Sequence, residues 1–198
     1  MTTRNLFQSL TLVALPLAAS ISSFGATAKS SDPAQFDVPR WVAERTRIAN
    51  LETDVDTQYA NDKLLCRGDK ACMHQAELKH AAGKRAVRID TNNNNNIHAK
   101  AIVAAMRMQQ RKNYLGADPK EIPENIRHFN VLTQLEQQEL DVMTQRSNAE
   151  ISCEGSSDSS CMANAEKAYQ EGMDGITMQE NTENGTHTKN LRNIRSGT

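Results

Sequence analysis

Apolar residues recur at helical spacing in two separate parts of the chain. In the first part, apolar side chains stand at i, i+3, i+7 and i+11 from Ile48 to Tyr59, which places them along one side of a helix. In the second part Pro123 stands where a helix can begin. The apolar positions that follow it with helical spacing are Ile126, Phe129, Leu132, Leu135, Val142 and Met143. Each part continues through a short turn into another helical segment, so the pattern predicts two helical hairpins over residues 39–89 and 123–178.

The segment between the hairpins is polar at its start and helical afterwards. Asp90, Thr91 and the asparagines at positions 92–96 have turn chemistry, so we expect the helical structure to be interrupted there. Residues 97–114 favour a fifth, connecting helix that bridges the hairpins or covers their open face. Residues 179–198 contain many Asn, Thr and Gly and almost no apolar residues, which predicts a disordered tail.

The two hairpins resemble each other residue by residue. Residues 51–68 match residues 138–155 at a constant offset of 87, and the match resumes at an offset of 89 beyond the turn. The thirteen identical pairs are Glu52/Glu139, Asp54/Asp141, Val55/Val142, Thr57/Thr144, Gln58/Gln145, Asn61/Asn148, Cys66/Cys153, Gly68/Gly155, Cys72/Cys161, Met73/Met162, Ala76/Ala165, Glu77/Glu166 and Gly83/Gly172. Chance similarity between polar helices is the competing explanation. We predict an all-α fold in which a duplicated, disulfide-clipped helical hairpin forms a four- to five-helix bundle, with the hairpins face to face about a pseudo-two-fold axis.

The N-terminal segment has the features of a secretory signal. Arg4 precedes an apolar stretch over residues 10–19, and residues 26–28 (Ala-Thr-Ala) supply a small-x-small cleavage pattern. We therefore expect residues 1–28 to be a signal peptide and residues 29–178 to be a single helical domain; a retained N-terminal anchor is the alternative. No later segment of the sequence has the roughly 20 apolar residues of a membrane span. The expected location is periplasmic or secreted.

An even number of cysteines in an exported chain favours disulfides. Cys66–Cys72 and Cys153–Cys161 each bracket a short turn-like segment, so we expect these two bonds. Cross-pairing between the clusters remains an alternative, and a zinc site is a third, although the spacings are wide for zinc.

The best candidate for function is a polar pattern that occurs in both hairpins. Its four residues stand at i, i+3, i+4 and i+7, so they line one side of a helix. The first polar stripe is Asp54, Thr57, Gln58 and Asn61, and the second polar stripe is Asp141, Thr144, Gln145 and Asn148. Three explanations remain open: a duplicated recognition surface, a polar contact between hairpins that fixes their register, or a recent duplication.

Histidines and methionines are the possible metal ligands in this sequence. His74 and His80 spread over about 120° of a helix and would need further ligands from elsewhere. Methionines at positions such as Met106 and Met108 could suggest copper(I), but helical Met more often fills a core. We expect no metal site and no cofactor.

Composition narrows the functional classes. Aromatic residues make up only 4% of the 198 residues, which favours helices over a sheet core. The net charge of −1 argues against nucleic-acid binding, and the sequence contains no GxSxG, P-loop or HExxH motif. We expect a non-enzymatic, exported helical protein of accessory, inhibitor or immunity type that docks a protein partner. A periplasmic metal or stress sensor is the alternative.

Overall fold

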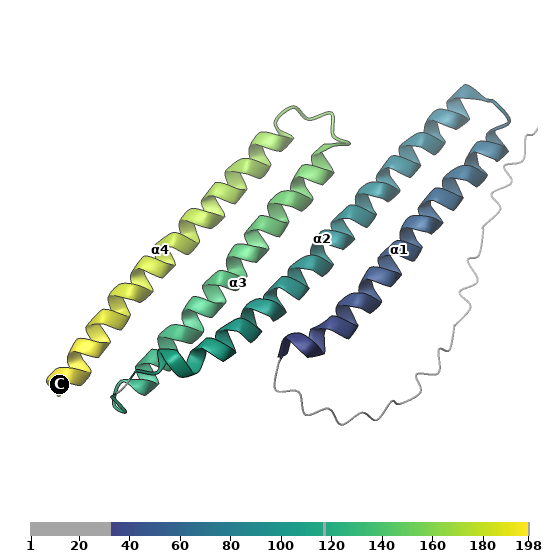
Figure 1. The fold of residues 1–198 in the computed structure, drawn as a ribbon. Helices are drawn as coiled ribbons and strands as arrows, with labels where there is room; N and C mark the ends of the chain where they lie inside the picture. Colours follow the sequence, from purple (N-terminus) through teal and green to yellow (C-terminus); the bar gives the residue numbers. More distant parts are fainter. Residues whose placement is uncertain (1–32, 117, 198) are drawn as a thin grey trace, which may run out of the picture.

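The chain folds into four long helices (Figure 1). This computed structural model describes residues 33–116 and 118–197. The helices are α1 (Pro33–Cys66), α2 (Lys70–Tyr114), α3 (Ile122–Cys153) and α4 (Cys161–Ser196), and the described residues contain no strand. The all-α prediction is confirmed, whereas the predicted signal peptide lies outside the described residues.

The helices lie side by side in one layer, in the order in which they occur along the chain (Figure 1). Among the described residues α1 packs against α2, α2 against α3 and α3 against α4, and no other pair of helices is in contact. The α1–α2 and α3–α4 turns lie at the same end of the layer (Figure 1), so α1 and α3 run in the same direction. The expected face-to-face packing of two hairpins is therefore wrong. The bundle is open, and α1 and α4 form its two edges.

A disulfide closes each of the two hairpin turns. Cys66–Cys72 joins the end of α1 to the start of α2, and Cys153–Cys161 joins α3 to α4, as predicted. In the first turn the backbone of Gly68 adopts a positive φ of 87°, which ends the helix because few other residues adopt that conformation. The Asp69 side chain then accepts a hydrogen bond from the backbone N–H of Cys72 at 2.7 Å and caps α2.

The predicted break over residues 90–96 is wrong, because α2 runs without interruption through the asparagines. Their side chains find partners on α3: Asn92 Nδ2 donates to Ser147 Oγ at 2.9 Å, and Asn96 Nδ2 donates to Asp141 Oδ1 at 2.8 Å. These tertiary bonds outweigh the low helix propensity of asparagine. The predicted connecting helix over residues 97–114 is consequently the second half of α2, and the structure has four helices.

The predicted disordered tail is also wrong, because α4 continues to Ser196. Its polar residues pair with α3 and with the turn before it. Arg127 Nη2 donates a hydrogen bond to Glu183 Oε1 at 2.7 Å, and Arg195 Nε donates one to Glu121 Oε1 at 2.7 Å. These contacts join the tail to residues 121–127, which lie far away in the chain, and the low apolar content of the tail did not reveal them.

The apolar core is thin and follows the contacts between neighbouring helices. Its buried members are mostly aliphatic or small: Ile48, Cys66, Ala76, Val87, Ala105, Phe129, Leu135, Ile151, Ala165 and Ile176. Several large apolar side chains stay exposed, among them Leu64, Leu65 and Met178. None of the described helices carries an apolar stretch long enough to cross a bilayer.

Candidate functional site

The first polar stripe lies on the free edge of the layer. Val55 and Tyr59 mark the side of α1 that contacts α2, since Val55 lies against Gly83 and Tyr59 stacks on His80. The stripe is centred about a third of a turn away from that side, and its four members, Asp54, Thr57, Gln58 and Asn61, are all exposed. Among the described residues their side chains make one hydrogen bond, from Gln58 Nε2 to Asp62 Oδ1 at 2.8 Å. Three of these four side chains thus remain available to a partner.

The second polar stripe lies along the contact between α2 and α3. Asp141 accepts hydrogen bonds from Lys100 and from Asn96. Asn148 accepts from Asn92 Nδ2 at 3.1 Å and donates to Asn93 Oδ1 at 2.8 Å. Thr144 is half-buried, with its hydroxyl donating to the Leu140 carbonyl at 2.8 Å, and Gln145 is exposed.

The electrostatics of Asp141 fit a residue that holds two helices together. Burial by itself would raise the pKa of this carboxyl, but the hydrogen bonds from Lys100 and Asn96 outweigh it and hold the pKa below its ordinary value. The carboxylate is therefore charged and paired at neutral pH. The aspartate and the asparagine of the stripe thus hold α2 on α3, whereas on α1 the same two residue types are open surface.

A buried ionic cluster joins α3 to α4; its members are Glu124, Arg127, His128, Glu183 and His187. Arg127 bridges the two carboxylates, at 2.7 Å from Glu124 and 2.7 Å from Glu183. His128 Nδ1 lies 2.7 Å from Glu183 Oε1, and His187 Nδ1 lies 3.0 Å from Glu124 Oε1. The two imidazole rings stack with centroids 3.9 Å apart and planes 3° apart. The cluster therefore clamps the first half of α3 to the second half of α4.

Charge pairing sets the ionisation of the cluster. Hydrogen bonds from Arg127 lower the pKa of Glu124 to about 2, against the burial of that carboxyl. Hydrogen bonds from Arg127, and to a lesser extent from His128, also lower the pKa of Glu183. Both carboxylates are thus charged at neutral pH, and both already have internal partners.

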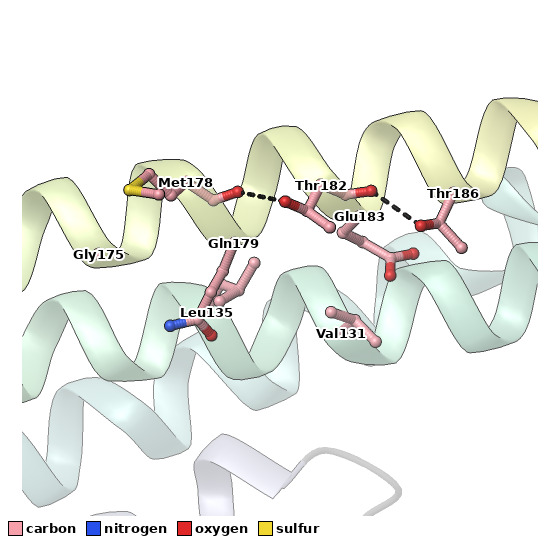
Figure 2. A pocket seen from close by; sticks show the side chains of 8 residues that line it. All are labelled: Val131, Leu135, Gly175, Met178, Gln179, Thr182, Glu183 and Thr186. Atoms are coloured by element: carbon pink, nitrogen blue, oxygen red, sulfur yellow. Dashed lines mark hydrogen bonds between the residues drawn. The ribbon is translucent and has the colours of Figure 1, made fainter.

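A shallow groove of about 510 Å³ runs between α3 and α4 beside this cluster (Figure 2). Leu135 and Val131 of α3 form one wall, and the α4 wall runs from Gly175 to Thr186. Thr182 and Thr186 turn their hydroxyls to the α4 backbone, where they donate to the carbonyls of Met178 and Thr182. The groove therefore offers an apolar floor with few free polar groups.

The histidines and methionines singled out for metal binding do not converge. His80 Nε2 lies 2.7 Å from Asp56 Oδ1, and the His80 ring stacks on Tyr59. His74 is exposed, with Glu77 at 4.0 Å. Met106 and Met108 are also exposed. In the part of the chain that the structure describes, no three His, Cys, Asp or Glu side chains are placed to hold a metal ion together.

Sequence reasoning missed the buried ionic cluster and a second stacked ring pair. Trp41 of α1 stacks on His98 of α2 with centroids 4.7 Å apart. These two positions correspond to His128 and His187, at offsets of 87 and 89. The signal was present, because the matches at an offset of 89 continue beyond Gly172 into the segment predicted to be disordered. They are Asn92/Asn181, Asn95/Asn184, His98/His187 and Lys100/Lys189.

Comparisons with protein-family models, curated proteins and solved structures gave no match to this chain.

Proposed function

We propose that this protein is an exported, non-enzymatic helical binding protein that docks a protein partner on the outer edge of α1. One observation carries the proposal. Asp141 and Asn148 hold α2 against α3, and the identical residues Asp54 and Asn61 stand exposed on α1 with no helix against them. A side-chain pattern that binds one helix inside the molecule is suited to bind another helix from outside.

The proposal includes a duplication, in which one ancestral hairpin gave rise to α1–α2 and α3–α4. Three kinds of contact support it, because each occurs at corresponding positions of the two hairpins. These are the disulfides, the stacked ring pairs Trp41/His98 and His128/His187, and the close approaches of Gly83 to Val55 and of Gly172 to Val142.

Export is the remaining part of the proposal. Two disulfides are consistent with an oxidising compartment outside the cytoplasm. The signal-like segment over residues 1–28 agrees with that location. Mass spectrometry of the protein from its host should find a mature chain that starts at Lys29 and has no free thiol, and a chain that retains Met1 would contradict cleavage.

Site-specific photo-crosslinking tests the docking surface. A photoreactive amino acid at Gln58 should give a crosslinked adduct in the native compartment, because Gln58 stands in the centre of the first polar stripe. The matched control carries the same group at Glu77, which is exposed on α2 outside that stripe. No adduct from Gln58, or equal adducts from both positions, would contradict the proposal.

The alternative, a metal or stress sensor, has less support because His80 is already engaged by Asp56 and Tyr59. Titration of the purified protein with copper, zinc and nickel separates the two functions. Micromolar binding of any of these metals would favour the sensor.

A further inference from the structure

The contact between α2 and α3 supplies a pattern against which the two free edges can be compared. At its centre Lys100 pairs with Asp141, and about two turns away Asn92 Nδ2 donates a hydrogen bond to Asn148 Oδ1. Further along, Arg88 pairs with Glu154 in the α3–α4 turn, and the nearby charge of Arg85 adds to that pairing. The contact is therefore largely polar and has a defined register.

The free edges carry the corresponding residues. Positions on α3 correspond to α1 at an offset of 87, and positions on α2 correspond to α4 at an offset of 89. The Lys100–Asp141 pair thus corresponds to Lys189 and Asp54, and Asn92–Asn148 corresponds to Asn181 and Asn61. Asp54, Asn61, Asn181 and Lys189 are all exposed, and among the described residues their side chains make neither an ion pair nor a hydrogen bond.

We propose that the protein partner of the first polar stripe is a second copy of this chain, whose α4 packs against α1 as α2 packs against α3. This inference rests on the proposed docking function of the α1 edge and names its occupant. In the contact, Lys189 of one copy pairs with Asp54 of the next, and Asn181 bonds Asn61. The two edges lie on opposite sides of the layer (Figure 1), so a molecule can use both at once.

The charges further along the edges also agree with this arrangement. Arg85 and Glu154 correspond to Asp174 and Arg67. In the internal contact the positive charge is on α2 and the negative charge follows α3. Between copies the negative charge of Asp174 is on α4 and the positive charge of Arg67 follows α1, so the two charges still attract each other. Both Asp174 and Arg67 are exposed.

An exposed leucine on α1 has a buried counterpart on α3. Ile151 lies between the Asn148 and Glu154 contacts with α2 and is 5% exposed. The corresponding Leu64 on α1 is 78% exposed. A neighbouring α4 in the same register would cover Leu64 and remove apolar surface from water, which favours association.

Part of the internal contact has no counterpart at the edges. Arg107–Glu136 corresponds to Ser196 and Ala49, and Arg88 corresponds to Thr177, so two ion pairs are missing. Asn96 corresponds to Gly185 and Ser147 to Ala60, so two hydrogen bonds are missing as well. The association between copies should therefore be weaker than the internal contact and depend on concentration. Because different surfaces of the two copies meet, the contact is head-to-tail and produces short chains or a closed ring.

Charge exchange tests the register directly. The full exported chain should gain average mass with concentration in sedimentation experiments from micromolar to millimolar protein. Asp54→Lys and Lys189→Asp should each weaken association by about tenfold or more, because each places like charges opposite one another. The double variant should recover most of the loss. Glu180→Lys is the control, since Glu180 is exposed on α4 about 100° around the helix from Asn181.

The outcomes separate this inference from the docking function itself. A chain that stays monomeric at every concentration, a double variant no better than the single variants, or a control as damaging as Asp54→Lys would overturn self-association. If the chain stays monomeric while Gln58 crosslinks to a different protein, self-association fails and the docking surface stands. If the chain self-associates and Gln58 crosslinks to a second copy, both proposals are supported.

Discussion

Gly83 of α2 lies directly against Val55 of α1, so closely that a Cβ atom on the glycine would be 2.8 Å from Val55 Cγ1. Gly172 of α4 meets Val142 of α3 in the same way, with a corresponding distance of 3.0 Å. Real Cβ atoms essentially never come within 3.0 Å of such an atom, so at Gly83 the missing side chain is what allows α1 and α2 to approach, and at Gly172 a Cβ atom would require Val142 to move. The spacing within both hairpins thus depends on one glycine each.

Replacing Gly83 by alanine should lower the free energy of unfolding by about 1 kcal/mol. Alanine ordinarily stabilises a helix by about 1 kcal/mol relative to glycine, but here the overlap with Val55 outweighs that gain. Urea unfolding followed by circular dichroism measures the effect. Gly175→Ala is the matched control, because open space surrounds Gly175 one turn after Gly172, and it should raise stability. Gly83→Ala should lower the free energy of unfolding less in a Val55→Ala variant than in the native chain. Equal losses in the two chains would contradict a clash between Gly83→Ala and Val55.

The features that sequence reasoning predicted correctly depend on residues close together in the chain. The helical spacing from Ile48 to Tyr59 is local, and each disulfide spans a turn of a few residues, so their pairing followed from proximity. Local patterns of this kind survive folding because tertiary contacts add to them rather than oppose them.

The errors occurred where distant contacts decide the structure. Asn92 and Asn96 have poor helix propensity, yet both bond residues of α3 that lie more than 40 positions away. In the sequence, Glu183 and His187 belong to a polar C-terminal segment. Only the fold brings Arg127 next to Glu183 and Glu124 next to His187. The roles of the two polar stripes also could not be separated from sequence. Their residues are identical, and only the position of α2 distinguishes Asp141 from Asp54.

The different surroundings of these two aspartates predict different stability effects. Asp141→Ala should lower the free energy of unfolding by about 1 kcal/mol or more, because it leaves Lys100 and Asn96 without their acceptor. Asp54→Ala should leave the stability of the monomer unchanged, since Asp54 is exposed and has no partner in the described structure. Chemical unfolding at low protein concentration compares them without interference from association. Equal losses would mean that Asp54 also holds an internal contact.

Removing the guanidinium from the buried ionic cluster should be costly. Arg127→Met leaves the carboxylates of Glu124 and Glu183 facing each other without a cation. We expect a loss of about 2 kcal/mol, less than for a fully buried ion pair because the Arg127 side chain is 39% exposed. Thermal and chemical unfolding measure the loss. Arg195→Met is the matched control on α4, since its pair with Glu121 is solvent-exposed on the arginine side, and it should have little effect.

The same cluster should make the protein sensitive to acid. The pKa of Glu124 falls from 4.5 to about 2 in the folded protein because Arg127 donates hydrogen bonds to the carboxylate, and the pKa of Glu183 is lowered for the same reason. A carboxyl with a lowered pKa binds fewer protons when folded than when unfolded. Its contribution is therefore complete above about pH 4.5 and is lost as the pH falls towards 2.

Glu124→Gln tests this assignment because it removes the titrating group while keeping a side chain of similar shape. The variant should be less stable than the native protein at neutral pH by about 2 kcal/mol, and its stability should fall less steeply between pH 4.5 and 2. Unfolding free energies measured across that range give both quantities. Glu180→Gln is the control, because Glu180 is exposed on α4 and its replacement should leave the pH dependence unchanged. Parallel curves for Glu124→Gln and the native chain would show that Glu124 does not supply this part of the acid sensitivity.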